Sequence, residues 1–191
     1  MFILIPALLS LVVAIVRGGR LIRLAQVPFR HAWVVSFSLA LQVIMFTPLW
    51  HALGGGERWI PPLYILSMLA LTAWFALNFR LPGMAVIGLG QILNLLVILS
   101  NGGRMPASPA ALERSGWISR FTAPGQTVYN NLTIATEETR LYFLGDIFAI
   151  PKEIPLANVF SAGDVLIALG AMYFLQRVLT DEGLDPPVAD D

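Results

Sequence analysis

The sequence predicts an all-α integral membrane protein with five transmembrane helices and a long extracytoplasmic segment between the fourth and the fifth. Of the 191 residues, 57% are hydrophobic and 13% are charged, whereas about 25% of residues are charged in soluble domains. The apolar residues gather in five runs, each near the roughly 20 residues that cross a bilayer. We therefore expect one membrane domain at residues 1–177, containing a polar segment at 101–160, and an acidic tail at 178–191.

Arginine, glycine and other polar residues separate the five runs from one another. Pro6 lies inside the first run and Pro48 inside the second. Because proline has no backbone N–H, we expect each to kink or locally open its helix. In chain order, the runs are Met1–Val16, His31–Leu53, Ile60–Leu77, Gly83–Ser100 and Ser161–Arg177.

The basic residues predict the orientation of these helices. Short loops rich in Lys and Arg stay on the cytoplasmic side, because their translocation is disfavoured. The short turn at residues 54–59 carries only Arg58, so we expect that end outside. The protein is thus expected in the cytoplasmic (inner) membrane as a multi-pass protein, with its amino terminus and segment 101–160 extracytoplasmic and its carboxyl terminus cytoplasmic. The arginines expected inside are Arg17, Arg20, Arg23, Arg30, Arg80 and Arg177.

Charge and composition exclude several functions. Twelve basic and twelve acidic residues cancel, so no basic stripe is available and nucleic-acid binding is not expected. The chain has no cysteine, and its two histidines lie at opposite ends of one run, so no metal site is predicted and no cofactor is indicated. No Asp, Glu or Lys lies in the interior of a run, which disfavours ion-coupled transport.

Three amide side chains, Gln42, Gln91 and Asn94, fall inside apolar runs. Amides in hydrocarbon need hydrogen-bond partners, and nearby glycine or serine lets helices approach closely enough to provide them. Two interpretations remain open: the amides hold helices together, or they line a hydrophilic path or headgroup pocket.

The polar segment begins where the fourth run ends, at Asn101. Gly102 and Gly103 are suited to left-handed backbone, and Pro106 prevents the helix from resuming. Successive amides beside Arg104 predict a cradle for an anion, whereas a helix stop with a snorkelling arginine explains the same residues. Asn101, Arg104 and Arg140 are therefore candidate ligand-binding residues.

Local patterns predict short elements in the rest of the segment. Ser108 is expected to cap a two-turn helix that ends before Gly116, and Thr136 to begin another. Residues 117–131 are expected to be loop. The run Leu141–Pro151 is too short to span and predicts an interfacial or re-entrant element. Ser161 and Asp164 predict a capping box at the start of the fifth transmembrane helix.

Asp146 follows a glycine within an apolar, aromatic stretch of the same run. A partly desolvated carboxylate has a raised pKa or pairs with a cation, for which Arg104 and Arg140 are the candidates. An Asp after Gly is also common as a turn or capping residue. Both interpretations of Asp146 remain open.

With these motifs in place, the chain resembles a family of uncharacterised bacterial membrane proteins, domain of unknown function 5317. The resemblance covers nearly the whole chain except the acidic tail, and it implies no activity, cofactor or catalytic residue. It is carried by Asn101–Pro106, Leu144–Asp146 and Asn158–Asp164, with support from Arg17–Leu21.

Three functions remain open. The leading hypothesis is a non-catalytic accessory, scaffold or assembly subunit that contacts membrane lipids and a membrane-protein partner or a second copy of itself. The alternative is a lipid- or small-molecule-binding protein, possibly enzymatic, with its site under segment 101–160; no nucleophile with a neighbouring base supports catalysis. The second alternative is a passive channel or facilitator along Gln42, Gln91 and Asn94.

Overall fold

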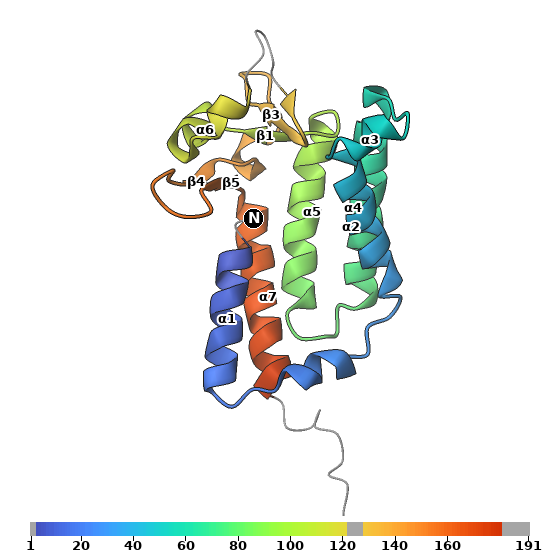
Figure 1. Cartoon of the computed structure of the whole chain (residues 1–191), viewed down its shortest axis with the longest axis vertical. Helices are drawn as coiled ribbons and strands as arrows, with labels where there is room; N and C mark the ends of the chain where they lie inside the picture. Colours follow the sequence, from blue (N-terminus) through green and yellow to red (C-terminus); the bar gives the residue numbers. More distant parts are fainter. Residues whose placement is uncertain (1–2, 122–127, 181–191) are drawn as a thin grey trace, which may run out of the picture.

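A computed structural model describes residues 3–121 and 128–180 of the chain. The fold is mostly helical, with a layer of long helices beneath a smaller layer of short strands and helices, which we call the cap (residues 101–160) (Figure 1). The predicted acidic tail falls largely on residues 181–191, outside the described residues. The long helices are α1 (Leu4–Val16), α2 (Trp33–Met45), α4 (Ile60–Leu77), α5 (Met84–Ser100) and α7 (Ala162–Thr180), and the short ones are η1 (Leu21–Gln26), α3 (Leu49–Ala52) and η2 (Glu57–Trp59).

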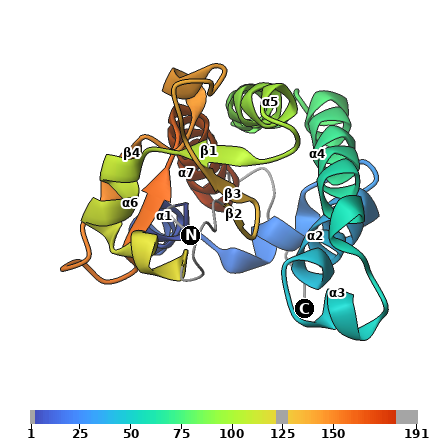
Figure 2. The ribbon, with the colours of Figure 1, turned by 90° about the horizontal axis from the view of Figure 1, so that it is seen from above.

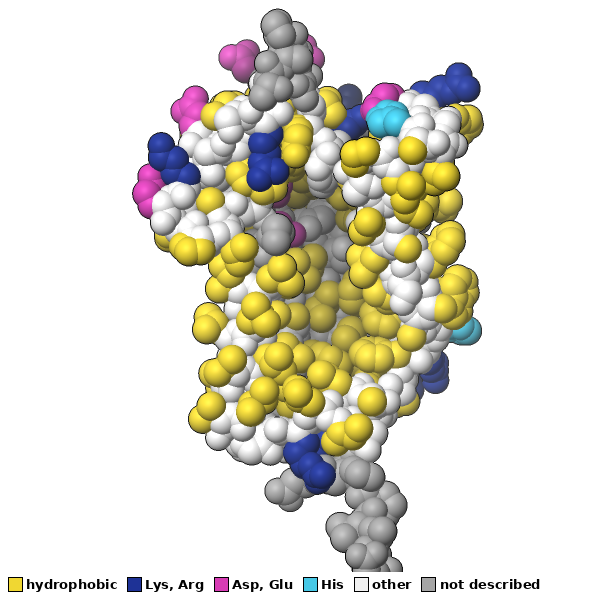
Figure 3. Space-filling model, in the orientation of Figure 1, with side chains coloured by type: hydrophobic (Ala, Val, Ile, Leu, Met, Phe, Trp, Pro, Cys, Tyr) yellow, Lys and Arg dark blue, Asp and Glu magenta, His cyan; other side chains and the backbone are white. Residues whose placement is uncertain are grey.

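The long helices form an open arc. In space their order is α1, α7, α5, α4, α2, since each packs mainly against its neighbours in that order. Seen from above, α1 and α2 stand at the two ends of the arc (Figure 2). On the open side the surface is hollowed, and hydrophobic side chains line the hollow (Figure 3).

Two of the helical segments in the described residues are long and apolar enough to cross a membrane. These are Glu57–Leu77 and Ala162–Thr180, while α1, α2 and α5 are apolar but shorter. The second predicted run is broken: α2 ends at Met45, and α3 begins after Pro48. Pro48 has no N–H to continue the helical hydrogen bonds, so the helix is interrupted there.

The cap contains strands, so the prediction of an all-α protein was wrong. One sheet has the order β1-β3-β2, with β1 (Met105–Ala107) parallel to β3 (Leu132–Ile134) and β2 (Val128–Tyr129) antiparallel to β3. A second pairs β4 (Phe148–Ile150) with β5 (Asn158–Phe160). The cap also holds α6 (Pro109–Ser115), η3 (Trp117–Arg120) and η4 (Tyr142–Leu144). Buried backbone groups must be paired, and in these segments of the cap the strands pair them with one another.

Glycines bring α5 and α7 into close contact. The two helices run antiparallel, with Gly83 opposite Gly170 and Gly90 opposite Gly163. A Cβ atom on Gly90 would overlap the carbonyl oxygen of Gly163, and one on Gly83 would overlap that of Gly170. The sequence spacing of seven in both helices places these glycines on one face, so the backbones meet directly.

The predicted helix starts differ in outcome. At α7, the Ser161 N–H donates to Asp164 Oδ2 (3.1 Å) and the Asp164 N–H donates to Ser161 Oγ (3.0 Å), which is a capping box. Ser108 precedes α6 as expected, but its side chain makes no capping hydrogen bond. No helix begins at Thr136: its N–H donates to Thr139 Oγ1 (2.8 Å), and this local bond closes a turn instead.

Candidate functional site

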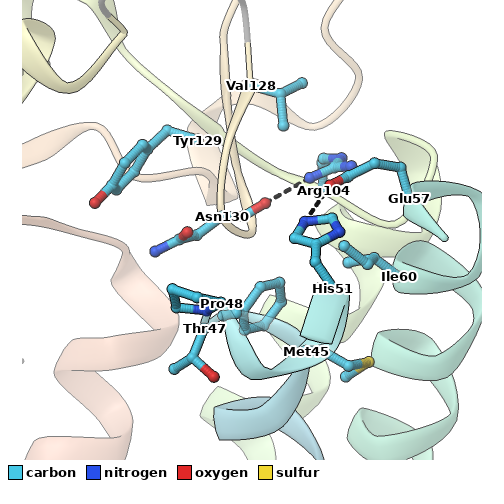
Figure 4. Close-up of a pocket in the computed structure, with 11 residues that line it drawn as sticks. Met45, Thr47, Pro48, His51, Glu57, Ile60, Arg104, Val128, Tyr129 and Asn130 are labelled. Atoms are coloured by element: carbon cyan, nitrogen blue, oxygen red, sulfur yellow. Dashed lines mark hydrogen bonds and ion pairs between the residues drawn. The ribbon is translucent and has the colours of Figure 1, made fainter. Parts of the chain in front are cut away.

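A cleft of about 400 Å³ lies between the cap-side ends of the helices and the β2–β3 hairpin (Figure 4). Its floor comes from the break between α2 and α3, including Phe46 and Pro48, and one wall from the start of α4 at Ile60. Its polar lining is Thr47, His51, Glu57, Arg104, Tyr129 and Asn130. The cleft therefore joins the cap to the helical layer at the end where α5 stops.

Arg104 is the central cation of this cleft. Gly102 and Gly103 precede it with φ of +67° and +82°, a left-handed turn that directs the chain from α5 into β1. Its Nη1 donates to the carbonyl oxygen of Asn130. Burial lowers the pKa of the half-buried guanidinium, and Glu57 opposes that shift. A desolvated cation that contacts only a neutral acceptor attracts an anion.

His51 and Glu57 form the second polar feature of the cleft. His51 Nε2 lies 3.1 Å from Glu57 Oε1, and both side chains are exposed. This contact ties the Glu57 carboxylate to α3, whereas Arg104 bonds to the hairpin (Figure 4). The cleft is thus lined by an acid, Glu57, that contacts His51, and by a cation, Arg104, that has no ion pair within the described chain.

Asp146 lies deeper in the cap, with 7% of its surface exposed. Its backbone is fixed, because its N–H donates to Pro106 O (2.9 Å) and its carbonyl accepts from the Ser108 N–H (3.0 Å). Its side-chain Oδ1 has no hydrogen-bond partner among the described residues. Burial raises the pKa of this carboxyl well above its usual range, and the charge of Asp164 raises it further. The group is therefore suited to hold a proton.

A hydrogen-bonded group surrounds Asp164 where α7 begins. Asn94 Nδ2 donates to Asp164 Oδ1 (2.9 Å), and Ser161 Oγ donates to Asn94 Oδ1 (2.8 Å). Together with the capping box, these bonds join α5 to α7 directly above the paired glycines. We call Asn94, Ser161 and Asp164 the α5–α7 polar cluster.

The structure brings together fewer of the predicted site residues than expected. Arg104 lines the cleft, but Arg140 does not: its backbone is paired with Asn101, whose Nδ2 donates to Arg140 O (2.8 Å) and whose Oδ1 accepts from Arg140 N (3.0 Å). Asp146 forms no ion pair with Arg104 or Arg140, which corrects that predicted pairing for the described residues. Backbone geometry holds Asp146 against β1, away from both arginines.

The three amides predicted inside apolar runs make contacts between helices. Gln42 Nε2 donates to Ser67 Oγ across the α2–α4 contact (3.0 Å), and Gln91 Nε2 lies 3.4 Å from Met68 O across the α4–α5 contact. Asn94 belongs to the α5–α7 polar cluster. Because each amide bonds to a different helix interface, the arrangement favours helix association over a continuous hydrophilic path.

Sequence reasoning did not predict five polar residues of the cleft, Thr47, His51, Glu57, Tyr129 and Asn130. They come from segments far apart in the chain, and none belongs to a motif of its own. The nearest indication in the sequence was Pro48, because a proline before His51 predicts a break at which a helix ends. Across residues 3–121 and 128–180, no group of three or more His, Cys, Asp or Glu side chains could hold a metal ion.

Comparison with known proteins identifies the family but no characterised relative. No curated protein and no solved structure matches the chain. A model of the family of unknown function DUF5317 matches residues 26–176, which is most of the chain. The matched region includes the cleft, Asp146 and the α5–α7 polar cluster. The protein therefore belongs to the DUF5317 family.

Proposed function

We propose that this protein is a multi-pass inner-membrane protein in which all five long helices lie in the bilayer and the cap faces outward. Two helices with sufficient length and hydropathy support the proposal. The face shown in Figure 3 adds support, since hydrophobic side chains cover its helical layer and charged ones gather towards the two ends. Helices of 13 residues, such as α1 and α2, reach only about 20 Å, so their flanking residues must complete the crossing.

Reporter fusions test this topology. We expect a periplasm-active reporter to be active when fused after Glu137 in the cap and inactive when fused after Thr180. A cytoplasm-active reporter should give the reverse pattern. Activity of the cytoplasmic reporter at Glu137 would contradict the proposed orientation.

Within that topology, we propose that the protein binds an anionic small molecule or lipid headgroup in the cleft, with Arg104 as the main contact. The observation that carries the proposal is a half-buried arginine facing a 400 Å³ cleft without an ion pair in the described chain. Placing a cation there costs desolvation free energy, which an anionic ligand offsets. Tyr129 and Asn130 add polar groups that suit a hydroxylated or phosphorylated ligand, and Phe46 with Pro48 adds apolar contact.

Binding assays on the purified full-length protein test this function. We would titrate glycerol 1-phosphate and short-chain phosphatidylglycerol into protein in mild detergent and measure the heat of binding. Replacing Arg104 by Gln should weaken binding at least about tenfold, because a charge-assisted contact is lost. R104K should retain part of the affinity. R140Q is the matched control, since Arg140 belongs to the same cap but lies outside the cleft.

The outcomes separate the two ligand sources. Binding of glycerol 1-phosphate alone indicates a soluble anion, whereas binding of the lipid alone indicates a headgroup held with its chains. Equal affinity of the wild type and R104Q for both probes, with melting temperatures unchanged, would overturn the proposal.

A second candidate function is the accessory, scaffold or assembly subunit. The open arc favours it, because α1 and α2 at its ends expose large apolar side chains such as Leu9 (61%), Val43 (62%) and Phe37 (63%). A partner helix would cover such surfaces, although lipid does so equally well. Purification from native membranes in mild detergent tests it: a monomer without an associated protein would remove this candidate.

A further inference from the structure

A second amphiphilic site lies at the opposite end of the helical layer from the cap. A pocket of about 490 Å³ there is lined by Arg30, Arg80 and Asn78, at the turn between α4 and α5. An apolar groove of about 330 Å³ runs between α4 and α5 from the same place. Ala76 and Phe79 line both, so the polar pocket and the apolar groove adjoin each other.

Small residues leave space in the groove: Ala76 lies on α4, and Ala85 and Gly88 lie on α5. Thr72, Phe75 and Ala76 form one stripe of α4 at helical spacing, and Phe79 follows just beyond the end of that helix. A Cβ on Gly88 would lie 3.2 Å from Phe75 Cβ, so side-chain bulk at this position would narrow the groove. Its lining is almost entirely apolar, which suits an acyl chain.

The pocket provides cations and a fixed scaffold for them. Asn78 Oδ1 accepts from the Arg30 N–H (2.9 Å), and its Nδ2 donates to Arg30 O (3.2 Å), so the start of α2 is held to the end of α4. The Arg80 guanidinium lies 5.7 Å from the centre of the Phe79 ring. Both arginines are exposed, and within the described chain neither makes an ion pair.

We propose that this site binds an anionic phospholipid, with the phosphate headgroup at Arg30 and Arg80 and one acyl chain in the α4–α5 groove. Charge complementarity selects the occupant: two arginines line the pocket, and none of its lining residues in the described part of the chain is acidic. The adjoining groove distinguishes a lipid from a free phosphate, because only the lipid gains by filling it. This site is separate from the cleft at Arg104 and does not depend on it.

Native mass spectrometry of the full-length protein released from nanodiscs tests the proposal. The nanodiscs contain equal amounts of phosphatidylglycerol and phosphatidylethanolamine. The wild type should retain phosphatidylglycerol preferentially, and R30Q/R80Q should lower its retention about fivefold per arginine. Arg58→Gln is the matched control, because Arg58 lies next to the opposite end of α4 and stacks on Trp59 as Arg80 stacks on Phe79.

A groove variant completes the test. Gly88→Leu should reduce retention of phosphatidylglycerol while binding of inorganic phosphate remains undetectable in every variant. The exposed arginines can be replaced without unfolding, so R30Q/R80Q keeps the proposal testable if G88L does not fold. Equal retention of the two lipids by the wild type, or an equal loss in R58Q and R30Q/R80Q, would overturn it.

Discussion

Helix α5 packs against α7 on one side and against α4 on the other, and the two sides use glycine differently. Towards α7, Gly83 and Gly90 face glycines of the partner helix, so backbone meets backbone. Towards α4, Gly88 faces the side chain of Phe75, and a groove of about 330 Å³ remains beside them. At these positions glycine brings two backbones into contact where the partner helix also has a glycine, whereas opposite Phe75 it leaves a groove.

Replacing single glycines should give the largest difference in the free energy of unfolding between the two sides of α5. Gly90→Ala places a methyl group against the Gly163 carbonyl, and the rigid backbone cannot move aside cheaply. We expect a loss of about 2–3 kcal/mol in the free energy of unfolding. Gly88→Ala, whose Cβ would lie 3.2 Å from Phe75 Cβ, should change it by less than about 1 kcal/mol, because alanine also favours the helix.

Unfolding in mixed micelles of mild detergent and dodecyl sulfate measures this difference. Both variants add one methyl group to the same helix, so each controls for the other. Equal destabilisation by G90A and G88A would show that the two sides of α5 are packed alike.

The polar contacts of α5 also differ between its α7 side and its α4 side. On the α7 side, Asn94 donates to Asp164 (2.9 Å) and accepts from Ser161 (2.8 Å), whereas on the α4 side Gln91 Nε2 lies 3.4 Å from Met68 O and 3.3 Å from the weak acceptor Met68 Sδ. Asn94→Leu removes the donor to Asp164 Oδ1 and the acceptor of the Ser161 hydroxyl, although the capping box between these two residues remains, and this loss should cost about 1–3 kcal/mol. Gln91→Leu should cost less than about 1 kcal/mol in the same unfolding assay. A larger effect at Gln91 than at Asn94 would reverse the comparison.

Two acids in and next to the cap differ in the same way. Asp164 is held by the α5–α7 polar cluster, while Asp146 has an oxygen without a partner in the described residues. Because burial raises the pKa of Asp146 above its ordinary value of 3.8, the folded protein keeps this proton at pH values where the unfolded chain has lost it. Rising pH above that ordinary value therefore lowers the free energy of unfolding, until the raised pKa is passed.

Asp146→Asn removes this titration. Melting temperatures from pH 4 to pH 8 should show the wild type losing stability relative to D146N as pH rises. Subtracting the melting temperature of one protein from that of the other removes the contribution of the other carboxyl groups, because these titrate in both. A difference that stays constant over this range would mean that Asp146 ionises with its ordinary pKa.

Local sequence patterns predicted the helices and their ends far better than the cap. Helix α4 occupies Ile60–Leu77, the predicted run, because Pro61 and Pro62 begin it and its apolar residues are uninterrupted. The capping box at Ser161 and Asp164 also follows from residues three apart. Three-residue strands such as β1 and β5 carry no such pattern, since a period of two cannot be recognised over so short a run.

Long-range contacts account for the rest. Asn94 and Asp164 are 70 residues apart in the chain, and nothing near either residue identifies the other as its partner. The cleft likewise joins Arg104, whose glycine turn was recognisable, to Asn130 and His51, whose roles depend on the fold. Sequence reasoning found Arg104, Asn94 and Asp164 but not their partners, and it did not single out the other polar residues of the cleft.

The smallest expected effect concerns α4 on its other side, towards α2. Gln42 donates to Ser67 Oγ (3.0 Å), and Ser67 also donates to the Tyr64 carbonyl of its own helix (2.7 Å). In a double-mutant cycle of Gln42→Leu and Ser67→Ala, we expect a coupling of about 0.6 kcal/mol, the average for hydrogen bonds between membrane helices. Ser100→Ala is the control, because Ser100 donates only to Leu96 O within its own helix (2.8 Å) and should show no coupling with Gln42. A coupling as large as the effect of Asn94→Leu would mean that polar groups stabilise the α2–α4 contact as strongly as the α5–α7 contact. The loosely packed part of α4 would then be its groove alone.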